Sequence, residues 1–215
     1  MLFLFLSFLM MMYTSRPFLR FLRAHLLLLG LSLTLTGSAA INSEQPSPRN
    51  EASLFELYSG KVMFHSGTQI ESFTGETTKV EGTLDAETGQ FEFRVDMASV
   101  DTGNSRRDRN MREDYMETDT YPYVTYEGKV QQLPDPEEAT EPQPVTSTGT
   151  FTIKDQTREV EIDGMMRYDK DAEAWHIEAG FEILLSDYNI SRPRFLLIRM
   201  QEDQEIELSF ELRPS

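Results

Sequence analysis

Residues 91–126 read FEFRVDMASVDTGNSRRDRNMREDYMETDTYPYVTY. Apolar and polar side chains alternate from the start of this stretch to Met97, and a period of two predicts a strand with one apolar face. The chain then becomes polar, and the alternating pattern returns at Val124, just after Tyr121-Pro122. The stretch therefore predicts two strands joined by a polar connection.

A short amphipathic helix is expected inside that connection, over residues 105–117. Ser105 is a suitable N-cap, and Met111 and Tyr115 have the i, i+4 spacing that places two side chains on one helix face. No other part of the chain after residue 53 has a helical pattern, so a single helix is predicted.

The rest of the chain alternates like the first strand, most regularly in its last third, and turn residues separate the runs. About eight strands joined mostly by hairpins predict an all-β fold, an eight-stranded antiparallel β-barrel whose closure removes exposed edges. Gly75 and Gly82 are expected at bulges or bends. Residues 133–144, with four prolines and four acidic residues, predict a solvated hairpin loop.

Residues 1–40 have the pattern of a secretory signal peptide: three arginines, an apolar run over residues 26–35, and small residues before a cut after Ala40 or Ala39. An uncleaved membrane anchor is the alternative. Residues 41–52 are predicted to be a polar linker and residues 53–213 one barrel domain. We therefore expect a periplasmic or secreted protein.

Charge and cysteine content exclude several functions. The formal net charge is −16, and removing residues 1–40 takes away three arginines and no acid, which leaves −19. Such a surface repels nucleic acid and anionic lipid headgroups. There is no cysteine, so disulfides, thiolate catalysis and thiolate metal ligation are excluded.

No catalytic constellation is recognisable. His65 and His176 lie in strand-like segments without the spacing of a metal site, and nucleophile-elbow, P-loop and dinucleotide-binding motifs are absent. We expect no catalytic residue, no metal site and no enzyme activity. A metal-assisted hydrolase that uses the two histidines remains a weaker alternative.

Several motifs together resemble the YceI-like family, which is described as binding polyisoprenoids in a lipocalin-like barrel. They are the turn Ser99-Val100-Asp101-Thr102, the Arg107-Asp108 pair, the Tyr121-Pro122 strand start, Gly149-Thr150-Phe151-Thr152-Ile153-Lys154 and Asp187-Tyr188-Asn189-Ile190. The chain departs from the family where Asp155 and Asn189 replace glycine, and where Asn110-Met111 replaces His-Leu, so no role of that histidine is carried over.

The resemblance implies a polyprenyl phosphate or isoprenoid quinone whose tail lies in the barrel, with no other cofactor. The candidate lining residues are Phe91, Phe93, Tyr126, Phe151, Ile153, Trp175 and Phe181, with Met111 and Tyr115 covering from the helix and Arg106 and Arg107 near the head group.

Periodicity alone favours a dry, packed core, and it is the family resemblance that favours a ligand site. The alternative function is therefore a ligand-free barrel that acts as a protein-interaction domain through its acidic face or its proline-rich loop. Arg192, Arg194 and Arg199 form a second basic cluster, and exposed strand ends would permit a homodimer.

Overall fold

The computed structural model describes residues 53–215 except residues 69, 193, 196 and 197. The predicted signal peptide and linker lie outside the described residues. The strands are β1 (Leu54–Gly67), β2 (Ser72–Thr77), β3 (Val80–Asp85), β4 (Gln90–Asp96), β5 (Tyr123–Val130), β6 (Gln143–Ile153), β7 (Gln156–Asp169), β8 (Ala174–Leu184), β9 (Arg194–Phe195), β10 (Ile198–Arg199) and β11 (Asp203–Pro214). The helical segments are η2 (Met97–Ser99), α1 (Ser105–Asn110), η3 (Met111–Tyr115) and η4 (Leu185–Tyr188).

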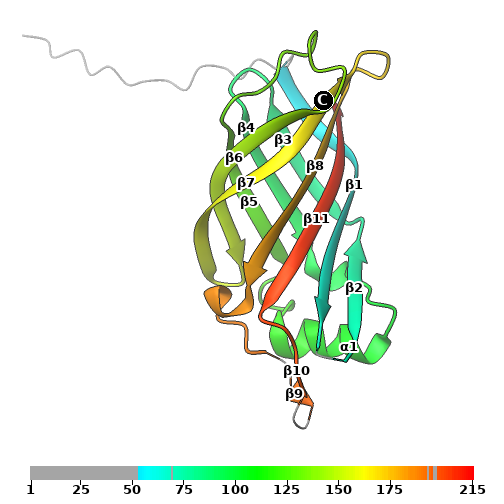
Figure 1. Cartoon of the computed structure of the whole chain (residues 1–215), viewed down its shortest axis with the longest axis vertical. Coiled ribbons are helices and arrows are strands. Elements are labelled where there is room, and N and C mark those ends of the chain that lie inside the picture. The colour runs from blue at the N-terminus through cyan, green and yellow to red at the C-terminus, as the bar shows by residue number, and fades with distance from the viewer. Residues whose placement is uncertain (1–52, 69, 193, 196–197) are drawn as a thin grey trace, which may run out of the picture. The chain divides into compact units, whose positions relative to one another are not determined.

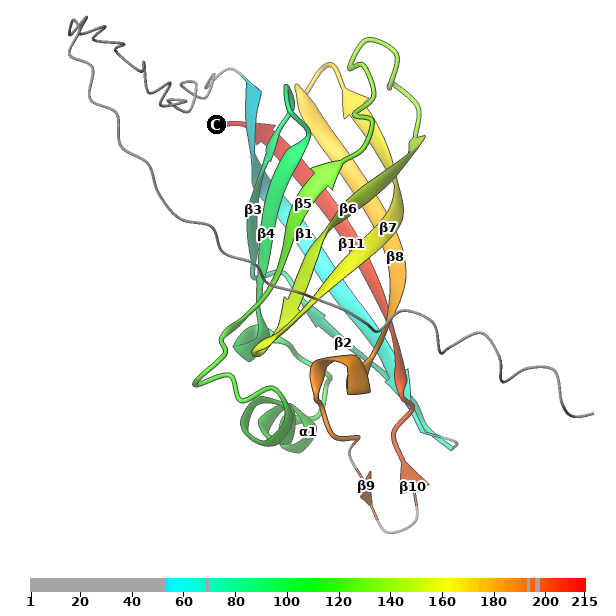
Figure 2. The ribbon, with the colours of Figure 1, turned by 90° about the vertical axis from the view of Figure 1, so that its left-hand side faces the viewer.

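The long strands form one antiparallel barrel (Figures 1 and 2). The order is β11-β8-β7-β6-β5-β4-β3-β1, and the pairing of β1 with β11 closes it. The first residues of β1 pair with β3, and its last residues pair with β2. The short strands β2 and β3 therefore together occupy one strand position in the barrel, next to β1. The predicted eight-stranded antiparallel barrel is confirmed. β9 and β10 form a separate hairpin.

Gly75 and Gly82 do not form the predicted bulges. Each lies directly opposite a phenylalanine in regular pairing, Gly75 opposite Phe64 and Gly82 opposite Phe93. A Cβ atom on Gly75 would lie 2.2 Å from Phe64 Cε1, and one on Gly82 would lie 2.1 Å from Phe93 Cδ1. The glycines are therefore needed because aromatic rings lie over them.

The predicted helix is divided into two segments. The side chain of Asn104, not Ser105, caps α1 by accepting hydrogen bonds from the backbone N–H groups of Arg106 and Arg107. From Met111 the helix widens into the π-helical turn η3, in which the N–H of Met116 donates to the Met111 carbonyl. Together α1 and η3 cover one end of the barrel, the helix end (Figure 2).

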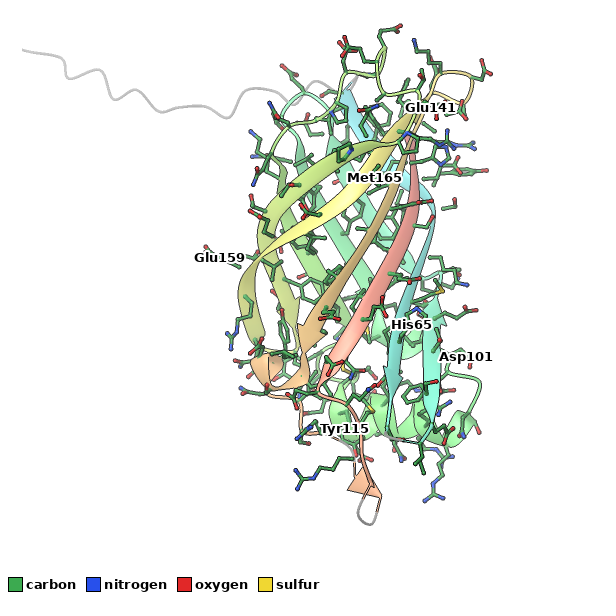
Figure 3. All side chains as sticks on the ribbon, in the orientation of Figure 1. His65, Asp101, Tyr115, Glu141, Glu159 and Met165 are labelled. Atoms are coloured by element: carbon green, nitrogen blue, oxygen red, sulfur yellow. The ribbon has the colours of Figure 1, made fainter. Side chains whose placement is uncertain are left out.

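Residues 131–142 cover the opposite end of the barrel, which we call the loop end (Figure 2). Figure 3 shows Tyr115 at the helix end and Glu141 at the loop end. The prediction of a solvated loop is wrong in part, because β6 begins at Gln143, and Ala139 is fully buried with its carbonyl accepting from the Tyr168 N–H. This loop therefore contributes to the core.

Buried side chains form two clusters, one toward each end. The loop-end cluster contains the largest fully buried side chains of the described residues, namely Trp175, Leu84, Met166 and Leu212. The helix-end cluster includes Val124, Phe151, Ile153, Leu185, Tyr188 and Ile190. The loop end of the barrel is thus filled with side chains, whereas the helix end is only partly filled.

Candidate ligand cavity

The helix end of the barrel contains a cavity of about 590 Å³. Its walls are mostly side chains at alternate positions of seven strands, which is the inward face that a period of two predicts. The apolar and aromatic lining residues of these strands are Val62 and Phe64, Phe73, Phe93 and Val95, Val124 and Tyr126, Phe151 and Ile153, Phe181 and Ile183, and Ile206, Leu208 and Phe210. Met111 and Tyr115 line the cavity from η3.

Nine of the eleven residues predicted for the ligand site line this cavity. They are Phe93, Arg106, Arg107, Met111, Tyr115, Tyr126, Phe151, Ile153 and Phe181. The structure does not bring Phe91 and Trp175 to it. Phe91 lines a second, smaller cavity, and Trp175 is fully buried in the loop-end cluster, 5.0 Å from the Tyr168 ring centroid.

Aromatic side chains separate the two cavities. Phe93, Tyr126 and Phe210 line both the main cavity and the second cavity, which is only about 60 Å³. The ring centroids of Phe93 and Phe210 are 5.0 Å apart, and Phe91 packs 4.8 Å from Tyr126. We call Phe93, Tyr126 and Phe210 the floor, because they mark where the open part of the barrel ends.

One wall of the cavity is formed by residues that were not among the predicted lining residues. Phe64 and Phe73 pack edge to face across β1 and β2, with ring centroids 6.0 Å apart, and Phe210 completes the floor from β11. The alternation of residues 206–212 was recognised but not assigned to the site. Val62 and Phe64 have the same two-residue spacing, which is the signal that would have found them.

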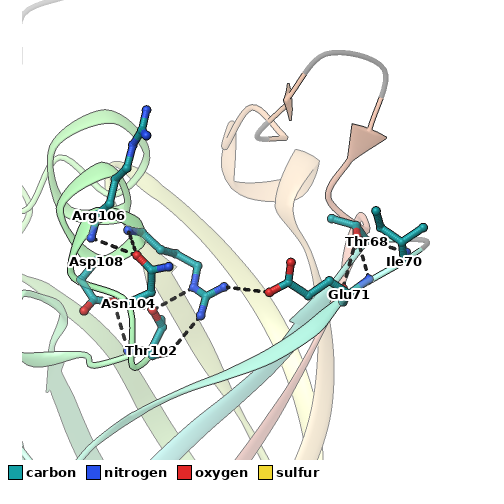
Figure 4. A network of polar contacts seen from close by, with 8 residues as sticks. Thr68, Ile70, Glu71, Thr102, Asn104, Arg106 and Asp108 are labelled. Atoms are coloured by element: carbon teal, nitrogen blue, oxygen red, sulfur yellow. Dashed lines mark hydrogen bonds and ion pairs between the residues drawn. The ribbon is translucent and has the colours of Figure 1, made fainter.

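A network centred on Arg107 fastens the helical cover to β2 (Figure 4). Arg107 donates from Nε to Thr102 Oγ1 and from Nη2 to the Thr102 carbonyl, both at 2.9 Å, and its guanidinium lies 3.8 Å from the Phe73 ring centroid. Buried Asp108 accepts hydrogen bonds from the backbone N–H and hydroxyl of Thr102. Glu71 Oε1 is 3.9 Å from Arg107 Nη1. Arg107 is therefore occupied within the protein.

Arg106 is the available cation at the cavity. Its side chain is exposed and forms no ion pair or side-chain hydrogen bond within the described residues. Asn104 and Asn110 line the cavity beside it and are also exposed. Because these residues are exposed, the cavity reaches the surface next to α1. This opening, the mouth, is polar, while the depth of the cavity is aromatic and aliphatic.

In the second basic cluster, defined above as Arg192, Arg194 and Arg199, one arginine has an acidic partner and another has none among the described residues. Arg192 pairs with Glu202 at 2.7 Å, whereas Arg199 is exposed without an ion pair in the described part of the chain.

Tyr126 is a titratable group in the cavity wall whose pKa is shifted by its surroundings. Burial raises the pKa of Tyr126, so its phenol stays protonated at neutral pH, and its hydroxyl lies 3.0 Å from Ser147 Oγ. His65 does not line the cavity and lies beside Thr74 and Glu207. Within the described residues no group of His, Asp or Glu could hold a metal ion.

No helix of the described residues is both long enough and apolar enough to span a bilayer.

Comparisons with known proteins agree with this architecture. The model of the YceI-like domain matches residues 56–213. A polyisoprenoid binding domain from Saccharophagus degradans, implicated in plant cell wall breakdown, superposes with a TM-score of 0.64 at 14% identity and covers 76% of this chain and 99% of its own. Burkholderia cenocepacia BcnA gives 0.59 at 18% identity, with 71% and 95% coverage. No curated protein sequence matches significantly.

Proposed function

The chain belongs to the YceI-like family, because the family model matches residues 56–213, and on this premise we propose that it binds the tail of an isoprenoid lipid in its cavity. The observation that supports the proposal is the apolar cavity of about 590 Å³ above the floor. A dry core would leave no such space, and pockets of roughly 300–1,000 Å³ are typical of small-molecule sites.

The size of the cavity limits the length of the tail. At roughly 30 Å³ for a group the size of a water molecule, the space takes about 20 such groups. A methylene group is of similar size, so the cavity suits about four isoprene units. Each buried methylene contributes roughly 0.8 kcal/mol, which is enough for binding without directed hydrogen bonds along the tail.

The head group of the lipid lies at the mouth in this proposal. A polyprenyl phosphate or an isoprenoid quinone would place its polar end beside Arg106, since this exposed cation has no partner within the described residues. Arg107 contributes indirectly, because it holds the helical cover in place.

The alternative of a ligand-free interaction domain has less support. In that alternative the proline-rich loop would be a surface that binds a partner protein. Ala139 of this loop, however, is fully buried in the loop-end cluster. Such a loop is less free to engage a partner than the sequence suggests. A ligand-free interaction domain also does not explain the apolar cavity of about 590 Å³.

The decisive experiment is organic extraction of protein purified from its native host, followed by mass spectrometry of the extract and native mass spectrometry of the intact protein. We expect a prenyl lipid in stoichiometric amount. Apo protein alone, together with no binding of added prenols or prenylquinones, would contradict the proposal and leave the interaction domain.

We further propose that the protein is an exported carrier or store of this lipid and not an enzyme. The proposal of export rests on the signal-like pattern of residues 1–40. Mass spectrometry of the mature N-terminus after cell fractionation tests it: a start at residue 40 or 41 outside the cytoplasm is expected, and an intact N-terminus in the cytoplasm would contradict it.

A further inference from the structure

Gln204 is a buried polar side chain in the wall of an otherwise apolar cavity. Only 3% of its surface is exposed, although it is among the residues that line the cavity. It is the second residue of β11 and precedes Ile206 and Leu208 on the inward face, so it is the inward residue of this strand nearest the helix end (Figure 2).

The orientation of the Gln204 amide is determined by its neighbours. Nε2 donates two hydrogen bonds to backbone carbonyls, to Gln201 O at 3.1 Å and to Asp203 O at 2.8 Å. The reverse orientation would bring Oε1 against two carbonyl oxygens, which cannot donate. Both donors of the amide are therefore used, and its oxygen is turned away from them.

This oxygen accepts no hydrogen bond from any described residue. Unlike Trp175 Nε1 and Ser66 Oγ, which are buried without a partner, this oxygen keeps some accessible surface, so water or a ligand group in the cavity can reach it. The Gln204 oxygen is thus an accessible acceptor on a residue of the cavity wall, without a donor among the described residues, and an O–H group of a bound ligand can replace the water that reaches it.

We propose that Gln204 Oε1 accepts a hydrogen bond from a hydroxyl group at the head of the bound lipid. The inference rests on the proposed function, since the tail must occupy the cavity below. It also selects among head groups. A quinone has only acceptors, and the phosphate oxygens of a polyprenyl phosphate are largely ionised at neutral pH, so neither offers the required O–H. A prenyl alcohol or a prenylated hydroquinone does.

The rival head group is a phosphate at Arg106. Arg106 has no partner within the described residues, but Arg107 beside it is held by Thr102 and Phe73, and Glu71 brings a negative charge to the same rim. A single uncommitted guanidinium is a weak site for a dianion. The mouth therefore suits a neutral head group better.

The test compares geranylgeraniol with its methyl ether and its monophosphate, which share one tail. Dissociation constants are measured for the full-length protein and for Gln204→Met, Arg106→Gln and Arg109→Gln. The unmodified protein should bind the alcohol about tenfold more tightly than the ether, as one hydrogen bond to an acceptor in an apolar cavity wall predicts. Gln204→Met should remove this difference, and Arg109→Gln, at an exposed side chain that does not line the cavity, should retain it. A prenylated hydroquinone of equal tail length shows whether a phenol serves as well as an alcohol.

The comparison of alcohol and ether in the unmodified protein needs no variant, so a folding defect in Gln204→Met does not affect it. Equal binding of alcohol and ether would overturn the role of Gln204 while the proposed tail binding stands. Tightest binding of the monophosphate, lost in Arg106→Gln, would assign the head group to Arg106. Binding of none of the three would overturn the proposed function as well.

Discussion

The ring of Phe93 lies over Gly82, and this contact determines how much room the cavity has. Because Gly82 has no side chain, the ring packs against the barrel wall and takes less of the interior. Phe64 and Gly75 repeat the arrangement between β1 and β2. The sequence contains these glycines and rings, but their register becomes known only once the strands are paired.

Substituting Gly82→Ala should destabilise the protein and weaken tail binding. The new Cβ would lie 2.1 Å from Phe93 Cδ1 and 2.5 Å from the Glu92 carbonyl oxygen, so the ring and the neighbouring strand must move. We expect a loss of about 1–3 kcal/mol in the free energy of unfolding, measured by urea denaturation.

Gly180→Ala is the matched control, because the nearest atom to its new Cβ is Ile206 O at 3.8 Å. It should leave stability nearly unchanged. Equal losses for the two variants would mean that the contact with Phe93 is not the cause.

At the scale of elements, α1 and η3 form a cover that is fastened at both ends. Arg107 ties its start to Thr102 and Phe73, and Glu117, just after η3, pairs with Lys154 in the turn between β6 and β7. The middle of the cover places Met111 and Tyr115 over the cavity. A lipid that enters from this end must pass the cover, so its fastening should control the rate of exchange.

Replacing Arg107→Met should loosen the cover without unfolding the barrel. The two hydrogen bonds to Thr102 disappear, and Asp108 keeps its own contacts with that residue. We expect faster amide hydrogen exchange in residues 103–118 and a faster dissociation of bound prenol, with little change in the exchange of the strands.

Arg109→Met removes the same charge from an exposed side chain with no ion pair in the described chain and serves as the control. Unchanged exchange in Arg107→Met, or the same increase in Arg109→Met, would contradict the fastening role.

The elements differ in how far the sequence predicts them. Met111 and Tyr115 have the spacing of a helix, but nothing in the local sequence pattern predicts its widening into a π-turn. The proline-rich loop was harder still, because one buried residue, Ala139, anchors it and a single alanine has no periodicity. Strand alternation is repeated many times and is therefore the more reliable signal.

For the molecule as a whole, alternation predicted the barrel but not how it is filled. Inward side chains are of the same types at both ends, so Trp175 and Phe151 were equally plausible lining residues from the sequence. The loop-end cluster around Trp175 leaves only the second cavity of about 60 Å³, and the main cavity begins above the floor. Which half stays open depends on ring positions across several strands, and these follow from the register of the barrel.

This division into a filled and an open half predicts a limit on tail length. The series runs from geraniol through farnesol and geranylgeraniol to longer prenols. Affinity should rise with each isoprene unit, because each unit buries more apolar surface. It should level off at about 20 carbon atoms, because a tail of that size fills the cavity of about 590 Å³. Competition against a fluorescent prenol measures the series. A steady rise beyond this length would show that the tail passes the floor, and no dependence on length would place it outside the barrel.

Phe210→Ala should move that limit, because Phe210 lies between the main cavity and the second cavity of about 60 Å³. Removing the ring joins the two spaces and adds the volume of the ring itself, so the longest tail that still gains affinity should grow by about one isoprene unit. The same substitution should lower the free energy of unfolding by roughly 3–5 kcal/mol, as is typical for a buried phenylalanine.

Phe55→Ala is the control, because it removes a similarly buried ring that lines neither cavity. It should lower the free energy of unfolding by a similar amount with no change in the length limit. If both variants shift the limit equally, general loosening of the barrel, and not the floor, sets the length of the tail.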